Sequence, residues 1–267
     1  MPLGRMKPAM TFISSPSHCQ SPVRSSMEAG VSIVAMSPQM LPRAQVLASR
    51  LALELIPRSA DAAGLVLEVH PDNLALRDCT RPGTRALVIE PHARRAPAYG
   101  RDLISRALGR GCRTVIDATA GFGTDAFDFV RRGKQVLAIE RVGVIAEMLM
   151  EAARRSCEQH GRDDLTVISA DAREQIAKQA RADVIFLDPM FPGRDRHSAR
   201  PRKAQQLLRA LAGDDLDAEE LARIARDKAL KRVVIKRPRT APPLAGKPDH
   251  CFRGRSVRYD IYFSHTR

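Results

Sequence analysis

The chain has 267 residues, with 44 lysine and arginine side chains against 30 aspartates and glutamates, a formal net charge of +14. This length suits one large or two modest domains, and a hydrophobic share of 44% can build a core, which excludes a wholly disordered chain. No apolar run approaches the roughly 20 residues of a membrane-spanning helix. The five cysteines form no CxxC pair, so neither a disulfide scaffold nor a zinc ribbon is indicated, and a cytoplasmic location is predicted.

The excess positive charge lies late in the chain. Residues 189–267 hold 19 basic and 9 acidic side chains, a net charge of +10, whereas residues 1–188 carry only +4. A basic zone on one side of a globular protein indicates a polyanionic partner, with nucleic acid the first candidate. The alternative is that arginine is simply abundant in a sequence with 36 arginines and 8 lysines.

Residues 1–40 are rich in serine, proline and methionine and lack hydrophobic periodicity, so we expect a disordered extension or a misassigned start there. The alternative first residues are Met27, Met36 and Met40. Residues 41–100 predict a small α+β module followed by an arginine-rich connector at 92–101. Its predicted elements are a helix at 44–55 and strands at 65–69, 74–77 and 86–90.

Residues 101–267 alternate between strand and helix patterns. The predicted strands are 114–118, 135–140, 165–169, 183–187, 232–236 and 257–263. The predicted helices are 124–132, 142–160, 172–180 and 216–230. Strands separated by single helices imply βαβ crossovers, which predicts an α/β fold with a doubly wound, mainly parallel sheet.

Ligands of such a sheet bind beyond the carboxyl ends of its strands, so the residues found there are candidates for binding. The first strand leads into the segment 117–125 (DATAGFGTD), whose two glycines permit a tight turn and a close approach to a ligand. Glu140, at the end of the second strand, can accept hydrogen bonds from both hydroxyls of a ribose. Asp171, after the third strand, can accept one from the exocyclic amine of an adenine.

Each of these signals has a structural alternative. The pattern Gly121-x-Gly123-x-x-Ala126 also satisfies a dinucleotide-binding motif, and a glycine turn is often only a turn. Glu140 is placed to interact with a helix dipole, and Asp171 to cap the next helix. A series of four successive strands that each end in an acid or a glycine loop favours a nucleotide-like cofactor.

The fourth strand ends in Asp188-Pro189-Met190-Phe191-Pro192, which distinguishes between reaction classes. An exocyclic amine on a base is a poor nucleophile, because its lone pair is delocalised into the ring. A carboxylate and a proline carbonyl can accept its two N–H groups, and Asp188 can take the departing proton. Phe191 can stack on the base. The alternatives are a strand-ending turn at Asp188-Pro189 and a core aromatic at Phe191.

These motifs closely resemble the RsmJ family of S-adenosylmethionine-dependent methyltransferases, which modify a guanine N2 near the 3′ end of small-subunit ribosomal RNA. The resemblance spans about residues 42–267. The segments that carry it are 117–127 (DATAGFGTDAF), 139–141 (IER), 187–192 (LDPMFP), 233–238 (VVIKRP), 241–245 (APPLA) and 259–262 (YDIY). It implies a class I methyltransferase (Rossmann-like) domain at 101–267.

The resemblance, together with the glycine turn, implies the site. The catalytic residues are expected to be Asp188, Pro189 and Phe191. The cofactor contacts are expected to be Asp117, Gly121, Gly123, Thr124, Asp125, Glu140, Arg141, Asp171, Ala172 and Asp188. At Asp171-Ala172 a member of the family has two serines, so the individual contacts of that pair do not carry over directly.

The basic residues near the catalytic loop are the expected RNA contacts. They are Arg94, Arg95, Arg196, Arg200, Arg202, Lys203, Lys236 and Arg237. A solvated surface loop is the alternative for the segment 194–203. The family tends to carry a glycine-rich run after paired arginines, and the segment 94–101 (RRAPAYGR) departs from it, which predicts a stiffer loop.

The sequence therefore predicts a guanine-N2 methyltransferase that uses S-adenosyl-L-methionine. Its partner is small-subunit ribosomal RNA or the assembled small ribosomal subunit, and neither a metal ion nor a membrane is expected to take part. One alternative is an NAD(P)-dependent oxidoreductase that uses the Gly121/Gly123 turn. Another is a non-catalytic RNA-binding assembly factor.

Overall fold

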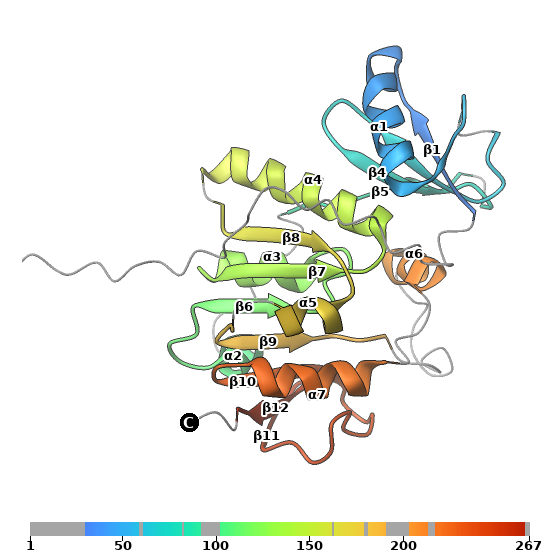
Figure 1. The fold of residues 1–267 in the computed structure, drawn as a ribbon. Helices are drawn as coiled ribbons and strands as arrows, with labels where there is room; N and C mark the ends of the chain where they lie inside the picture. The colour runs from blue at the N-terminus through green and yellow to red at the C-terminus, as the bar shows by residue number, and fades with distance from the viewer. Residues whose placement is uncertain are drawn as a thin grey trace, which may run out of the picture.

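The computed structural model describes residues 30–58, 61–81, 83–91, 102–161, 163–178, 181–190, 203–212 and 217–264, except for the side chains of residues 203 and 205. Two sheets organise this part of the chain (Figure 1). A small five-stranded sheet near the N-terminus stands beyond α4 (Gly143–His160), which separates it from a seven-stranded sheet.

The small sheet has the order β2-β1-β3-β4-β5. Its elements are β1 (Val31–Ala35), the 3-10 turn η1 (Pro38–Met40), α1 (Leu41–Leu51), β2 (Glu54–Leu55), β3 (Leu65–Val69), β4 (Leu74–Asp78) and β5 (Leu87–Val88). β1 pairs in parallel with both β2 and β3, and Ile33 is fully buried. The expectation that residues 1–40 form an extension is therefore wrong from Val31 onward, while residues 1–29 lie outside the described residues.

Ion pairs join the N-terminal module to α4. Arg43 of α1 pairs with Glu151 at 2.8 Å, and Arg50 pairs with Glu147 at the same distance. The predicted helix at 44–55 ends early, because Ala52 adopts a left-handed conformation with φ of 55°, and the chain then enters β2. The module is thus held against the helical layer of the larger sheet.

The large sheet has the order β11-β12-β10-β9-β6-β7-β8. Its strands are β6 (Thr114–Asp117), β7 (Gln135–Glu140), β8 (Leu165–Ser169), β9 (Val184–Leu187), β10 (Arg232–Pro238), β11 (His250–Arg253) and β12 (Val257–Phe263). β8, β7, β6, β9 and β10 run parallel, and β12 and β11 close one side as an antiparallel pair. The predicted doubly wound, mainly parallel sheet is confirmed, with β11 as an unpredicted addition.

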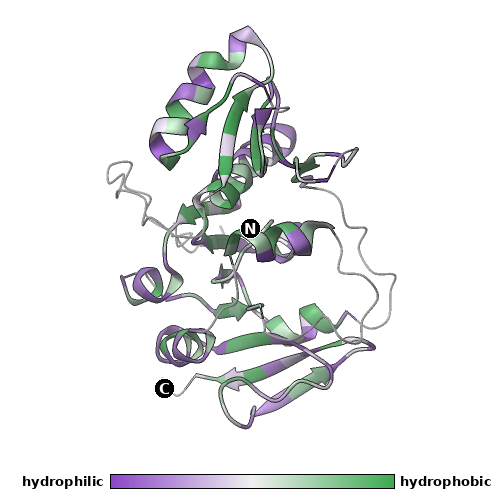
Figure 2. Ribbon diagram, turned by 90° about the vertical axis from the view of Figure 1, so that its right-hand side faces the viewer, coloured by the Kyte–Doolittle hydropathy of each residue, from purple (hydrophilic) through white to green (hydrophobic). Residues whose placement is uncertain are grey.

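Helices cover both faces of this sheet. They are α2 (Leu103–Leu108), α3 (Thr124–Arg131), α4, α5 (Ala172–Lys178), α6 (Lys203–Ala212) and α7 (Ala218–Lys228). Alternate strand residues point to opposite faces, so Phe186 packs edge-on against Phe129 of α3, whereas Ile185 belongs to the core beneath α5 and α7. Figure 2 shows the hydrophobic residues concentrated in the strands and on the helix sides that meet them.

None of the helices in the described ranges is long and apolar enough to cross a membrane.

Candidate active site

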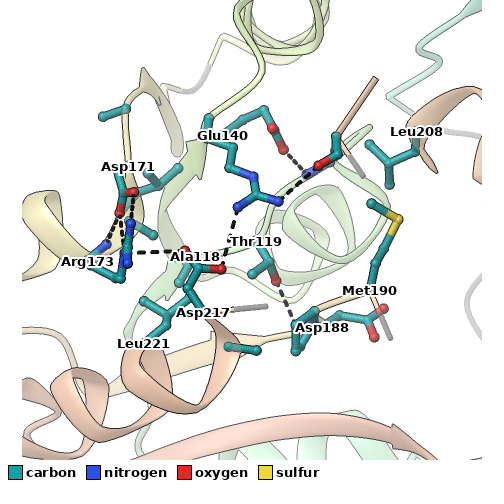
Figure 3. A pocket seen from close by; sticks show the side chains of 18 residues that line it. Ala118, Thr119, Glu140, Asp171, Arg173, Asp188, Met190, Leu208, Asp217 and Leu221 are labelled. Carbon is teal, nitrogen blue, oxygen red and sulfur yellow. Dashed lines mark hydrogen bonds and ion pairs between the residues drawn. The ribbon is translucent and has the colours of Figure 1, made fainter. Parts of the chain in front are cut away.

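A cavity opens at the carboxyl ends of β6, β7, β8 and β9, where a doubly wound sheet binds its ligands (Figure 3). It encloses about 600 Å³, including space open to solvent. Six of the sequence-predicted cofactor residues line it, namely Gly121, Glu140, Arg141, Asp171, Ala172 and Asp188. Its apolar walls include Ala118, Ile139, Met190, Leu208 and Leu221.

Glu140, at the end of β7, is fixed in the wall of this cavity by two backbone N–H groups. Gly121 donates to its Oε2 and Val142 to its Oε1, each at 2.8 Å, and the residue is only 6% exposed. Gly121 reaches this position in a left-handed conformation, with φ of 53°, that favours glycine. A carboxylate held on both oxygens has little freedom, and each carboxylate oxygen can accept more than one hydrogen bond.

Asp171 lies at one side of the cavity, against Arg173 (Figure 3). The Arg173 guanidinium donates to both Asp171 oxygens, at 3.2 and 2.7 Å, and these hydrogen bonds lower the pKa of the Asp171 carboxyl. Asp217 pairs with Arg173 at 3.3 Å and with Arg141 at 3.5 Å. The cavity wall is therefore a charge network in which Asp171 is held ionised.

Asp188 lies beyond the end of β9, on the side of the cavity opposite Glu140 (Figure 3). Its backbone N–H donates to Thr119 Oγ1 at 2.7 Å, which fixes the start of the Asp188-Pro189 segment to the turn after β6. Its carboxylate pairs with the Lys236 ammonium at 2.8 Å. The side chain is 33% exposed, so a ligand in the cavity can reach it.

Further charged groups lie behind Asp188, outside the lining of the cavity. Lys236 also pairs with Asp125 of α3, at 2.6 Å. Asp117 is 1% exposed, and burial, with repulsion from Asp125 and Asp188, raises the pKa of its carboxyl well above the ordinary value. Three carboxyl groups and one ammonium thus gather at the ends of β6, β9 and β10.

The family model described as "Putative SAM-dependent methyltransferase" matches residues 47–264. A protein of Chromohalobacter salexigens named ribosomal RNA small subunit methyltransferase J is 38% identical over 235 residues, which cover 81% of this chain and 91% of that protein. A Coxiella burnetii protein of the same name is 36% identical, over 87% of this chain and 96% of its own length.

The chain belongs to the ribosomal RNA small subunit methyltransferase J family.

It is therefore a methyltransferase, and S-adenosylmethionine is its cofactor. These relatives do not favour the oxidoreductase or the non-catalytic alternative. A solved structure of a SAM-dependent methyltransferase from Neisseria gonorrhoeae superposes with a TM-score of 0.66, over 88% of this chain and 98% of that one, at 24% identity. That likeness supports the fold.

The cavity of this family member fits the cofactor chemically. Glu140 offers acceptors for ribose hydroxyls, and the apolar side chains of Ile139 and Leu221 border a space suited to a flat base. Gly121 keeps the turn open, since a Cβ there would lie 3.3 Å from Leu208. Among the described residues, no group of three or more histidine, cysteine, aspartate or glutamate side chains is placed to hold a metal ion.

Four predicted cofactor residues do not line the cavity. Asp117 is buried beneath it, and Asp125 is engaged by Lys236. Gly123 faces Leu149, which a Cβ would approach to 2.4 Å, so this glycine serves packing. Thr124 lines a neighbouring cavity between α3 and the end of the N-terminal module.

Lys236 and Arg237, two of the predicted RNA contacts, are largely buried in the structure. Lys236 is 17% exposed and bound to two carboxylates, and Arg237 is 4% exposed and donates to the Pro242 carbonyl. Their strand continues inside the sheet, where the sequence suggested an accessible end. The other expected contacts lie outside the described residues: Phe191, Arg94, Arg95, Arg196, Arg200, Arg202 and the side chain of Lys203.

Sequence reasoning missed Thr119, Arg173 and Asp217. Thr119 lies inside the glycine turn, and its role depends on the Asp188 backbone 69 residues later. Arg173 had a local signal, since it follows Asp171 by two residues on the same helix start. Asp217 had none, because it reaches the cavity only through the placement of α7.

Proposed function

We propose that this chain transfers a methyl group from S-adenosylmethionine to the exocyclic N2 amine of a guanine in small-subunit ribosomal RNA. The Asp188 carboxylate carries the proposal, because it is the cavity acid that is both accessible and followed by a proline carbonyl. A carboxylate and a neighbouring carbonyl are matched to the two N–H groups of such an amine. The family names and the basic C-terminal part of the chain support RNA as the substrate.

The residues of this site contribute orientation and a proton acceptor. When bound, S-adenosylmethionine supplies an electrophilic methyl group. Asp188 and the Pro189 carbonyl hold the amine so that its lone pair points away from the ring, and Asp188 takes the proton that the amine loses. Thr119 fixes the Asp188 backbone, which keeps this acceptor in place without reorganisation.

The RNA is expected to approach from the side of the segment 191–202, which lies outside the described residues. Its arginines, Arg196, Arg200 and Arg202, stay predicted phosphate contacts. The target guanine must expose its N2 edge, which requires it to leave its stack. We place the reaction in the cytoplasm, where either free ribosomal RNA or the assembled small subunit serves as substrate.

The proposal is tested in a strain that lacks the gene. Mass mapping of small-subunit ribosomal RNA should show one N2-methylguanine missing, restored by the wild-type gene and not by Asp188→Asn. The matched control is Asp183→Asn, at the opposite end of β9, which caps the N–H groups of Arg113 and Thr114 and should restore the methyl group. An unchanged methylation map in the deletion strain would overturn the proposal.

A further inference from the structure

Lys236 occupies an unusual position for a basic residue in a protein of this charge. It is a largely buried lysine on β10, and its ammonium bridges Asp125 of α3 and Asp188 at the end of β9. Both N–O distances, 2.6 and 2.8 Å, are those of charge-assisted hydrogen bonds. Neither the glycine turn nor the catalytic loop explains this lysine.

Strand register explains why these groups meet. Asp117 pairs with Phe186, and Phe186 with Val234, so all three point to the face covered by α3. Asp188 and Lys236 each follow one of these residues by two positions and therefore point to that same face. Asp125, in the first turn of α3, completes the group from above.

Without Lys236, this cluster would contain carboxyl groups and no cation. Asp117, Asp125 and Asp188 would place three carboxyl groups together in a poorly solvated space, where like charges disfavour ionisation. Burial alone would lower the pKa of the Lys236 ammonium, but Asp188 and Asp125 hold its pKa above the ordinary value. The ammonium therefore stays charged and offsets one carboxylate beside the place of methyl transfer.

We propose that Lys236 is a positioning residue for methyl transfer: its bridge to Asp125 fixes one oxygen of Asp188, so that the other oxygen accepts from the substrate amine. Lys236 itself does not touch the substrate. Asp125 is the anchor that stops the lysine from following Asp188 into the cavity. The inference rests on the proposed function where methyl transfer is measured. Where cofactor binding is measured, it needs only the cofactor.

The other ionisable groups facing this cluster are few among the described residues. Tyr259 of β12 is the register partner of Lys236, and Asp117 stands on β6. Glu140 ends the next strand, β7, where it is occupied by the N–H groups of Gly121 and Val142. None of them is a cation that could replace Lys236.

The first test measures the pH dependence of single-turnover methyl transfer by wild type, Lys236→Met and Lys236→Arg. Removing the cation leaves three neighbouring carboxyl groups without a counter-ion, which favours proton uptake by the cluster, so in Lys236→Met the acidic limb should move to higher pH by about one unit or more. The maximal rate should fall about tenfold to hundredfold. Lys236→Arg retains the charge and should keep the limb of the wild type.

The matched control is Lys231→Met. Lys231 lies five positions before Lys236 and pairs at 2.9 Å with Asp183, which lies five positions before Asp188. This second lysine–aspartate pair joins the same two strands at their amino ends, away from the cavity. Its loss should lower stability without moving the acidic limb. A limb in Lys236→Met that coincides with that of Lys231→Met would overturn the proposal.

The second test uses calorimetry with the cofactor and its product and needs no RNA. S-adenosylmethionine carries a sulfonium charge that S-adenosylhomocysteine lacks. Lys236→Met leaves the cluster one unit more negative, so the affinity for S-adenosylmethionine relative to S-adenosylhomocysteine should rise about tenfold. An unchanged ratio, in a variant that binds both, would overturn the charge-compensating role. If wild type transfers no methyl group to RNA, the proposed function fails while this ratio still tests Lys236.

Discussion

The backbone N–H of Gly121 and the carboxylate of Glu140 lie 2.8 Å apart, and this hydrogen bond joins the turn after β6 to the end of β7. β6 and β7 are neighbouring strands of the parallel sheet, and the second oxygen of the carboxylate accepts from the Val142 N–H. The acid is thus held in its binding orientation before any ligand arrives. Such preorganisation reduces the entropy lost when the cofactor binds.

Replacing Glu140 tests this arrangement. Glu140→Gln puts an amide donor opposite one of the two backbone N–H groups, so one hydrogen bond is replaced by a repulsive contact. Losing a hydrogen bond to a charged group costs about 1.5–3 kcal/mol, and we expect affinity for S-adenosylhomocysteine to fall about tenfold or more in calorimetry. Glu147→Gln on α4, which breaks the pair with Arg50 of α1, should bind normally. Equal affinities in both variants would contradict the assignment.

Replacing Gly123 with alanine should destabilise the protein more than replacing Gly133, a glycine of similar backbone conformation. Its φ is 73°, and a Cβ would lie 2.4 Å from Leu149. Gly133 has φ of 71° with nothing within 4 Å of such a Cβ. Gly133→Ala should therefore show the conformational cost alone, about 1–2 kcal/mol. Gly123→Ala should lower the free energy of unfolding by about 1–3 kcal/mol more than Gly133→Ala does, as measured by urea denaturation. Equal losses in the two variants would show that the Leu149 side chain moves aside without cost.

The N-terminal module should lose stability in acid through Glu68. This β3 residue is 1% exposed, and although burial raises its pKa, hydrogen bonds from Arg77 and His70 bring the pKa below the ordinary 4.5. Because the folded pKa is the lower one, its stabilisation is complete above about pH 4.5 and disappears as the pH falls through the folded value.

Glu68→Gln should therefore be less stable than wild type at pH 7, with the difference narrowing below pH 4.5. Urea denaturation monitored across this range measures the difference. Glu54→Gln, at an exposed position of the same sheet, is the control that removes one carboxylate without touching the Arg77–Glu68 pair. A difference for Glu68→Gln that stays constant with pH would disprove the role of this ion pair.

Neutralising Arg196, Arg200 and Arg202 to glutamine should weaken RNA binding and flatten its dependence on salt. Each lost phosphate contact on single-stranded RNA lowers the slope of log K against log salt by about 0.7, so a decrease of up to about 2 is expected. Cofactor affinity should not change. A control variant that neutralises the exposed arginines Arg58, Arg85 and Arg223 removes the same charge elsewhere. Equal slopes in the two variants would place the RNA on another surface.

The strand ends were the part of the site most accessible to sequence reasoning. Periodicity located β6, β7, β8 and β9, and a parallel sheet brings the ends of such strands together whatever the details of packing. Glu140, Asp171 and Asp188 were found in this way, and all three line the cavity. The same logic failed for Asp117, because a residue at a strand end can also point beneath the cavity floor.

Contacts between distant segments could not be predicted in this way. Lys236 looked like a basic strand end, and only the register of β10 beside β9 shows that its ammonium meets Asp188 and Asp125. β1 was missed for a different reason. Its five residues follow a long stretch without hydrophobic periodicity, and they are too few to show a periodic pattern of their own. A short buried strand such as β1 is identified by its pairing with β2 and β3, and this pairing cannot be read from the sequence.

The place of β1 has a practical consequence for shortened forms of the protein. A chain begun at Met36 or Met40 would lack this strand, and β3 would become an edge whose backbone N–H and C=O groups have no partner on one side. Because β3 also carries the fully buried Val66 and Leu67, such an edge would be both apolar and open to pairing with another chain. Aggregation on expression, rather than a smaller active enzyme, is the outcome to expect from either truncation.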